Sequence, residues 1–398
     1  MYYLGLDFGT SGARATIIDD SKTRIWSAQL DYAAPQQQEA RDWQDALFAL
    51  LAQIPATLRP ALQAIAIDGT SGTVLLADAD LHPVTPALPY NHPLAGDPAA
   101  KLAWLKQHQQ SGQARYLMHQ VDYLNALLTG IGGISDYHNA LKSGFNVQTL
   151  DWQDGIYNSD DRALLPRIVA PGTILGKLQR RIARHYNLNP ACVVRAGTTD
   201  SIAAFIAAEV DTPGIAVTSL GSTLALKLLS KQYVASPQHG VYSHKWGDAW
   251  LVSGASNSGG AVLRQFFSDD ELALYSARIQ PQIASALDYY PLPCTGERFP
   301  VNDPELMPRL TPRPADNAVF LHGLLEGIAN IERQAYARFA ELGATPLRQV
   351  ITAGGGSRNP HWQIIRQRLL RVSVTVAANT DAAFGSAILA KGLDWIHK

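Results

Sequence analysis

Apolar residues along the chain follow two patterns, short strand-like runs and longer segments with helical spacing. The first 30 residues predict three strands, and residues 41–57 predict a helix with its apolar side chains on one face. Further helices are predicted over 98–109, 121–128, 199–209, 259–267, 318–342 and 360–370. Residues 291–314 carry seven prolines and predict an irregular excursion. This mixture of strands and helices indicates an α/β or α+β protein with layered sheets.

Three segments repeat one design, in which an apolar strand ends in a short glycine- and hydroxyl-rich turn and a second apolar strand follows. They are Leu4–Asp19, Ala64–Asp78 and Gly214–Ser230. We therefore predict three hairpins of one type. The first and third lie about 210 residues apart, near half of the chain length, which predicts a duplicated domain. The predicted boundary lies just before the third hairpin, near the stretch AAEVDTPGIAV.

The amino-acid composition argues against several classes of function. Of the 398 residues, 46% are hydrophobic and 17% are charged, which is enough apolar material for large cores. The net charge of −1 leaves no general basic surface to attract nucleic acid or an anionic membrane. No apolar run approaches the ~18 residues of a membrane span. Met1 leads almost directly into the first predicted strand, so no targeting segment is expected. The two cysteines fit no metal-ligand or disulfide spacing. We therefore expect a cytoplasmic protein that binds neither nucleic acid nor membrane.

The tip of the first predicted hairpin combines a carboxylate with glycines and hydroxyls, in the order Asp7, Gly9, Thr10, Ser11 and Gly12. Glycine lets backbone N–H groups converge on a ligand, and such a concavity binds anions. A carboxylate beside a phosphate requires an intervening cation, so Asp7 would hold Mg²⁺, commonly through water. Thr10 and Ser11 would add hydroxyl donors. The alternative is an ordinary turn in which Asp7 is a turn former.

The third predicted hairpin has the tip Gly221, Ser222 and Thr223, which offers amides and hydroxyls without an acid. This tip suits the other end of a phosphate chain, and it also fits a plain turn. The phosphate-binding sequence GxxxxGK[ST] does not occur in the chain. Phosphate binding, if it occurs, is therefore not of the P-loop type.

Two helix starts carry further candidate chemistry. In RAGTTDSIAAFIAA, Thr198 or Thr199 can cap the helix, which places Asp200 in its first turn. The helix dipole would keep Asp200 ionised, so that it could accept a proton from a substrate hydroxyl. The alternative is simply a favourable aspartate at a helix start.

Near the C-terminus, in VITAGGGSRNPHWQIIRQRLL, a predicted strand ends in Gly354, Gly355 and Gly356. Asn359 would cap a helix that begins with Pro360. A flat ligand could lie against the bare glycine backbone, with Trp362 and Asn359 as an apolar wall and a polar contact. A tight turn followed by a core tryptophan explains the same residues.

In this order along the chain, these stretches resemble the FGGY family of carbohydrate kinases, which share the actin-like ATPase (ribonuclease H-like) fold. The resemblance covers nearly the whole chain and includes GLDFGTSGARA, AGTTDSIAAF, SLGST, GERFPVNDP, AGGGSRNPHW and DAAFGSAILA. It implies an α/β protein of two domains closing over a cleft. Residues 1–207 with 381–398 would form the sugar-binding domain, and residues 208–380 the nucleotide-binding domain.

The resemblance also implies the reaction, in which a sugar hydroxyl receives the γ-phosphate of Mg-ATP. Asp200 would be the general base, Asp7 would organise Mg²⁺, and Thr10 would touch the γ-phosphate. The remaining contacts to ATP would come from Ser11, Gly221, Ser222, Thr223, Gly354, Gly355, Asn359 and Trp362. The implied partner is a small sugar, bound by a monomer or a homodimer.

Two segments of the chain depart from the family pattern, and both correspond to stretches near the sugar site. DGTSGTVLL stands in place of the Gln-Met-His-Gly stretch, and LPYNHP stands in place of the Trp-x-Asp-x-Arg sugar-contact segment. With SDYHNALK and TSLGSTLALKLLS, these departures resemble a short branch that includes D-ribulose kinases, in which Ser71 would lie at the sugar site beside Asp7 and Asp200. We therefore expect D-ribulose to be converted to D-ribulose 5-phosphate. D-Xylulose, another ketose or polyol, and a sugar-stimulated ATPase activity remain the alternatives.

Overall fold

The computed structural model of the protein describes residues 1–34 and 39–392. Its contacts divide the chain into two compact units. The first comprises Met1–Ala207 together with the C-terminal segment that begins at Asn379, and the second comprises Ala208–Ala378. Residues 393–398, which we assigned to the sugar-binding domain, lie outside the described residues.

The first unit is built on a six-stranded mixed sheet with the order β11-β12-β4-β1-β2-β3. Its strands are β1 (Tyr2–Phe8), β2 (Gly12–Asp19), β3 (Arg24–Asp31), β4 (Leu62–Gly69), β11 (Ile174–Lys177) and β12 (Val193–Thr199). Strand β1 runs antiparallel to β2 and parallel to β4, and β4 runs parallel to β12. The nearly continuous apolar runs of β1 and β4 fit strands that are buried on both faces.

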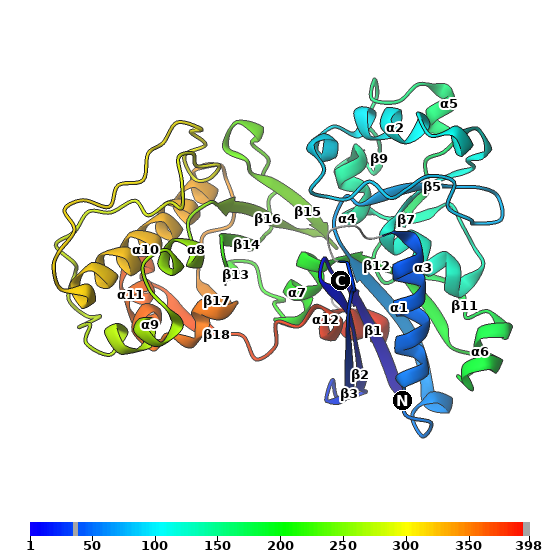
Figure 1. The fold of residues 1–398 in the computed structure, drawn as a ribbon, viewed down its shortest axis with the longest axis horizontal. Coiled ribbons are helices and arrows are strands. Elements are labelled where there is room, and N and C mark those ends of the chain that lie inside the picture. Colours follow the sequence, from blue (N-terminus) through cyan, green and yellow to red (C-terminus); the bar gives the residue numbers. More distant parts are fainter. Residues whose placement is uncertain (35–38, 393–398) are drawn as a thin grey trace. The chain divides into compact units, whose positions relative to one another are not determined.

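Helices cover both faces of this sheet (Figure 1). They are α1 (Ala40–Gln53), α3 (Gln120–Thr129), α6 (Arg180–Tyr186), α7 (Asp200–Ala207) and α12 (Ala382–Lys391), with the short η2 (Arg59–Ala61). Helix α1 packs on α3 and on β2 and β3, whereas α12 packs on β1, β4 and α7. The last described helix therefore completes the core that the first strand begins.

The chain between β4 and β11 forms a smaller layer with its own apolar core, which includes Val74, Leu88, Leu102 and Leu117. Its strands are β5 (Val74–Ala77), β6 (Tyr116–His119), β7 (Ile134–Asp136), β8 (Phe145–Asn146), β9 (Asp151–Trp152) and β10 (Arg167–Val169). Its helices are α2 (Pro98–Lys106), α4 (Tyr137–Ala140), α5 (Ser159–Arg162), η3 (Pro93–Gly96), η4 (Gln109–Gln113) and η5 (Leu141–Ser143).

The prediction of the second hairpin is wrong. Its two strands, β4 and β5, do not pair with each other, because β4 joins the large sheet while β5 pairs with β6. The Gly-Thr-Ser-Gly turn at Gly69–Gly72 therefore carries the chain from one sheet to the other. The first and third predicted hairpins do form, as β1–β2 and β13–β14.

The second unit repeats the same sheet architecture, with the order β15-β16-β14-β13-β17-β18. Its strands are β13 (Ile215–Leu220), β14 (Leu224–Ser230), β15 (Tyr242–Trp246), β16 (Ala249–Ser256), β17 (Gln349–Ala353) and β18 (Ser373–Val376). Five strands in each sheet correspond, since β16-β14-β13-β17-β18 has the same order and the same strand directions as β3-β2-β1-β4-β12. This repetition matches the predicted duplication.

The helices of the second unit include the long α10, whose apolar face packs against the sheet and against α11. They are α8 (Gly260–Arg264), α9 (Asp269–Ser276), α10 (Asn317–Glu341), α11 (Pro360–Leu370), η6 (Pro237–His239) and η7 (Gly355–Arg358). The proline-rich stretch 291–314 contains no regular helix or strand, as its prolines predict. The six helices predicted beyond residue 57 all form, although α8 is shorter than expected.

In the described part of the chain, no helix has both the length and the apolar character needed to cross a membrane.

We predict that the contact between α12 and α7 tolerates no side chain at Gly385. A Cβ there would lie 1.9 Å from the backbone oxygen of Ala203 on α7. Gly385→Ala should therefore lower the free energy of unfolding by about 1–3 kcal/mol, the usual cost of overpacking, in urea titrations. Gly112→Ala is the control, because a Cβ at Gly112 meets no atom within 4 Å. Equal stability of the two variants would contradict the prediction.

Candidate active site

Three carboxylates gather where parallel strands of the first unit end. Asp7 lies near the end of β1 and is directly opposite Asp68 on β4 in the strand register. Thr199, the last residue of β12, is opposite Gly69, and Asp200 follows it as the first residue of α7. The side chains of Asp7 and Asp68 are buried, at 4% and 0% exposure. Parallel pairing thus brings together acids that are far apart in the sequence.

Asp7 and Asp68 form a buried carboxyl pair in which both pKa values are raised. Burial raises the pKa of Asp68 well above its usual range, and the neighbouring charge of Asp7 adds to this. Burial also raises the pKa of Asp7, although hydrogen bonds from Asp68 and Arg14 oppose the shift. Ser386 on α12 donates to Asp68 Oδ2 at 2.6 Å. The arrangement favours a protonated Asp68 beside an ionised Asp7, because two adjacent buried carboxyls do not both ionise readily.

Arg14 supplies the positive charge of this cluster, and our sequence reasoning did not single it out. It is directly opposite Asp7 in the β1–β2 hairpin, and its Nη1 lies 2.9 Å from Asp7 Oδ2. Arg14 is only partly buried, so its guanidinium also reaches solvent. The hairpin register could have identified it, because a short turn at Gly9–Gly12 pairs the residues on either side of it.

Asp200 begins α7, as predicted, but the expected threonine cap is wrong. The Thr198 hydroxyl is 2.8 Å from His138 Nδ1, and the buried Thr199 hydroxyl has no hydrogen-bond partner among the described residues. The N–H of Ser201 donates to Asp200 Oδ1 at 2.6 Å. The charge of Asp200 also contributes to the raised pKa of Asp68, which places the two groups within electrostatic reach of each other.

Several buried polar atoms around these strand ends lack a partner within residues 1–34 and 39–392. They are Ser71 Oγ, Asp68 Oδ1, Thr199 Oγ1 and Gln120 Nε2. Buried polar atoms are nearly always hydrogen-bonded in native proteins, to protein, water or ligand. A group of them in one region therefore indicates a site that a polar ligand or water molecules complete.

Oxygen ligands for a divalent cation are present but few. Within the described ranges, no group of three or more histidine, cysteine, aspartate or glutamate side chains is arranged to hold a metal ion. Mg²⁺ is usually bound by one or two carboxylates together with water and substrate phosphates. Asp7, with Asp68 beside it, fits that mode of binding.

The second unit contains a cavity of about 720 Å³ beside the tip of the β13–β14 hairpin. It is lined by Leu220, Gly221, Ser222, Gly260, Leu263, Arg264, Asp269, Leu272, Ala273, Ser276, Ala277, Gly355, Gly356, Arg358, Asn359, Pro360, His361 and Trp362. Five of the nine residues predicted for the nucleotide are among them. Thr223 and Gly354 are not, and Thr10 and Ser11 belong to the first unit. A volume of this size accommodates a nucleotide-sized ligand.

Two glycines let other turns approach this hairpin tip closely. Gly354 has a φ of +80°, and a Cβ there would lie 2.8 Å from the backbone oxygen of Leu220. Gly259 has a φ of +147°, and its Cβ would lie 2.7 Å from the backbone oxygen of Ser222. Gly354 therefore shapes the hairpin side of the cavity without lining it.

Asn359 and Trp362 both line the cavity, and both also make hydrogen bonds within the protein. Asn359 caps α11 as predicted, since its Oδ1 accepts from the N–H of Trp362, and its Nδ2 donates to Ser276 Oγ at 2.8 Å. Trp362 is only 2% exposed, and its indole N–H donates to the Leu325 carbonyl. Trp362 thus lines the cavity with one edge while it belongs to the core.

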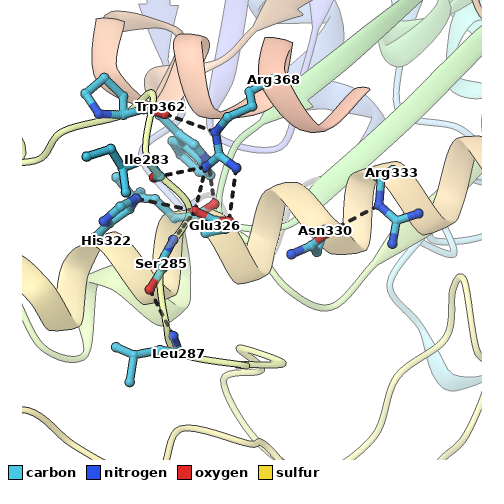
Figure 2. Close-up of polar contacts among 11 residues, drawn as sticks. Ile283, Ser285, Leu287, His322, Glu326, Asn330, Arg333, Trp362 and Arg368 are labelled. Atoms are coloured by element: carbon cyan, nitrogen blue, oxygen red, sulfur yellow. Dashed lines mark hydrogen bonds and ion pairs between the residues drawn. The ribbon is translucent and has the colours of Figure 1, made fainter. Parts of the chain in front are cut away.

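Elsewhere in the second unit, Glu326 on α10 binds the segment that follows α9 (Figure 2). Its carboxylate accepts from Arg368 Nη2 at 2.7 Å and from the N–H of Ser285 at 3.0 Å, and His322 Nε2 lies 3.3 Å away. Arg368 also donates to the Pro281 carbonyl. Burial by itself raises the pKa of Glu326, but its contacts with His322 and Arg368 lower it to about 2.

Both units match domains of one known protein family. Residues 90–207 match the N-terminal domain, and residues 216–391 the C-terminal domain, of the FGGY family of carbohydrate kinases. The chain belongs to this family. It is an ATP-dependent carbohydrate kinase with the actin-like ATPase fold.

Several known proteins align with this FGGY kinase over nearly its whole length. A xylulose kinase of Streptomyces coelicolor is 26% identical over 98% of this chain and 87% of its own. A solved structure described as a "xyloylose kinase" from Brucella ovis has a TM-score of 0.87 at 23% identity, covering 100% of this chain and 92% of the other. The gluconate kinase of Lactobacillus acidophilus has a TM-score of 0.84 at 16% identity, covering 98% and 88%. These structural similarities establish the fold.

We predict that Glu326 stabilises this kinase in a pH-dependent way. Its folded pKa of about 2 lies below the ordinary glutamate value of ~4.3. Its contribution is therefore fully present above that ordinary value and is lost as the pH falls through it towards 2. In urea titrations, Glu326→Gln should be less stable than wild type by about 1–3 kcal/mol at pH 7, and the difference should shrink at pH ~4.

The matched control is Glu341→Gln on the same helix, because Glu341 pairs with Arg338 at the surface. This control should differ little from wild type at either pH. A Glu326→Gln deficit that stays constant from neutral to acidic pH would contradict the assignment.

Proposed function

We propose that this kinase transfers the γ-phosphate of ATP to the terminal 5-hydroxyl of a ketopentose, with D-ribulose as the first candidate. The observation that carries the proposal is the carboxylate cluster of Asp7, Asp68 and Asp200 beside the unpartnered hydroxyl of Ser71. A ketopentose is polar on every face, and a site built of carboxylates and hydroxyls offers it hydrogen-bond partners. A cytoplasmic location, where ATP is available, is part of the same proposal.

D-Xylulose is the second candidate, and a different observation favours it. The relatives that cover nearly all of this chain are named xylulose kinases. D-Ribulose and D-xylulose differ only in the configuration of one carbon, and single polar contacts decide between such isomers. The Ser71 turn is where such a contact would be made, because Gly69–Gly72 replaces the stretch that many family members carry there.

In the proposed reaction, Asp200 orients the terminal hydroxyl and accepts its proton as the oxygen attacks the γ-phosphate. Asp7 remains ionised because Asp68 is protonated and Arg14 contributes a positive charge. Arg14 and the hairpin amides at Gly9–Gly12 would offset the charge of the transferring group. Bound Mg²⁺, held by Asp7 through water, would neutralise charge on the phosphate oxygens.

The nucleotide would bind in the 720 Å³ cavity of the second unit. The amides of Gly221 and Ser222 at the hairpin tip would contact the phosphates. The bare backbone at Gly355 would lie against the base. Among the residues that the structure describes, a Cβ there would meet one atom within 4 Å, Arg358 Nη2 at 3.8 Å. The Asn359–Ser276 hydrogen bond would hold the two walls of the cavity, α9 and α11, in place.

A sugar panel tests the proposal directly. ADP formation would be measured with D-ribulose, D-xylulose, L-ribulose and glycerol, each against a control without sugar. D-Ribulose should give the highest kcat/KM. A higher kcat/KM with D-xylulose would replace the first candidate by the second, and ADP formation independent of every sugar would support an ATPase.

We predict that Asp200→Asn lowers kcat by roughly 10²–10⁴, the usual contribution of a positioned general base. The amide keeps the size of the side chain but cannot accept the proton. The sugar KM should change far less, because the hydrogen bond to the substrate hydroxyl is retained in part. Asp45→Asn, at an exposed position of α1, is the control. An unchanged kcat for Asp200→Asn would remove the base assignment.

We predict that Gly355→Leu raises the KM for ATP by about tenfold or more, since a side chain there would fill space assigned to the base. The sugar KM should stay near its wild-type value. Gly112→Leu provides the comparison, because both glycines lie in short 3₁₀ helices with open space around them. If the ATP affinity of Gly355→Leu matched that of Gly112→Leu, the cavity would not be the nucleotide site.

A further inference from the structure

Tyr90 connects two loops of the first unit that the proposed reaction uses separately. It belongs to the LPYNHP stretch, and its side chain is about half exposed. Its phenol oxygen lies 3.1 Å from Thr10 Oγ1, at the tip of the β1–β2 hairpin. Thr10 is the hydroxyl that we assign to the γ-phosphate, so a tyrosine is hydrogen-bonded to a group of the reaction centre.

The backbone of Tyr90 is fixed on the strand that follows the Ser71 turn. Leu88 pairs with Val74 through two backbone hydrogen bonds of 3.0 and 2.8 Å. Two residues further on, the N–H of Tyr90 donates to Thr73 Oγ1 at 3.1 Å. The main chain at Tyr90 therefore cannot move independently of residues 73–74.

A chain of buried hydroxyls continues from there to α3. Gln120 Oε1 accepts from both the N–H and the hydroxyl of Thr70, each at 2.9 Å. The Thr70 hydroxyl has then used its only proton, so Thr73 must donate across the 2.7 Å contact between the two threonines. Thr73 can in turn accept from the N–H of Tyr90. The hydrogen bonds of this series therefore all run in one direction, from Tyr90 through Thr73 and Thr70 to the acceptor Gln120.

Ser71 lies inside this series, between Thr70 and Gly72. The carbonyl of Gly72 accepts from the buried ammonium of Lys101 at 3.3 Å. The turn that we assign to the sugar is therefore held on both sides of Ser71. Tyr90 extends the same hydrogen-bonded unit to Thr10.

We propose that Tyr90 is a positioning residue that orients the Thr10 hydroxyl for phosphoryl transfer and ties this orientation to the sugar-binding turn. The inference rests on the proposed function, in which the Ser71 turn contacts the sugar, and on the expectation that Thr10 touches the γ-phosphate. A threonine hydroxyl has one proton, and phosphate oxygens are acceptors. Either hydroxyl can donate across the 3.1 Å contact. In the proposed arrangement the phenol of Tyr90 donates to Thr10 Oγ1, and the Thr10 hydroxyl turns its proton towards a phosphoryl oxygen of bound ATP.

The test is a double-mutant cycle with Tyr90→Phe and Thr10→Val, assayed with the best sugar of the panel. Phenylalanine keeps the ring and the backbone N–H that donates to Thr73, so the anchored turn stays intact. Tyr90→Phe should lower kcat by about 5- to 10-fold, which corresponds to one hydrogen bond, with the sugar KM changed less than about twofold. The double variant should be no slower than Thr10→Val alone, because the phenol acts only through Thr10.

Tyr186→Phe makes the same chemical change at a tyrosine of the first unit that stacks on Phe48. It should leave kcat at the wild-type value. All variants should unfold at the wild-type temperature, so that a loss of activity reports on position and not on folding.

The outcomes separate this inference from the proposed function. A wild-type kcat for Tyr90→Phe, or fully additive losses in the cycle, would overturn the inference while the kinase reaction stands. A preference for D-xylulose would change the substrate but leave the cycle valid. If no sugar stimulated turnover in the wild type, both the proposed function and the role of Tyr90 would be overturned.

Discussion

Parallel pairing of β1, β4 and β12 is the constraint on which the candidate site depends. The register places Asp68 opposite Asp7, and the pairing of β12 with β4 brings the start of α7, and with it Asp200, to the same edge of the sheet. Holding acids together in a buried place is costly. The Arg14–Asp7 ion pair and the hydrogen bond from Ser386 to Asp68 offset part of this cost. A shift of one residue in the β1–β4 pairing would direct Asp68 to the face of the sheet opposite to Asp7.

The two units share one sheet architecture but carry different residues at the hairpin tips. Each has a glycine-containing hairpin beside a parallel strand. Asp7 stands two residues before Gly9 in the first hairpin, whereas Ser219 stands two residues before Gly221 in the second. The hairpin without an acid faces the large cavity, whose volume suits a nucleotide. The hairpin with the acid lies beside Asp68 and the Ser71 turn. Duplication followed by the loss or gain of one carboxylate would account for this difference between the two hairpins.

Local signals predicted much of this structure. The hairpins at Leu4–Asp19 and Gly214–Ser230 form because their partner strands are adjacent in sequence, and the Asn359 cap before Pro360 follows from short-range hydrogen bonding. The segment Ala64–Asp78 has the same local pattern, yet the partners of its strands lie elsewhere, on β1, β12 and β6. Nothing within the segment encodes those pairings.

The candidate site was partly predictable for the same reason. Asp7, Asp200 and the glycine turns stand out locally, because a carboxylate or a glycine at a strand end is visible in the sequence. Asp68 gains its role from a parallel pairing, and Tyr90 reaches Thr10 across 80 residues, so neither appears in a local pattern. Trp362, expected as a cavity wall, is mainly a core residue because α11 packs on α10.

The position of the phosphate on the product tests the central claim most directly. A ³¹P–¹H correlation spectrum of the product formed from D-ribulose and ATP would show which carbon carries the new phosphate. We expect coupling of the phosphorus to the C5 methylene protons, because Asp200 is assigned to activate the terminal hydroxyl. Coupling to the C1 protons, or a spectrum with inorganic phosphate alone, would contradict it.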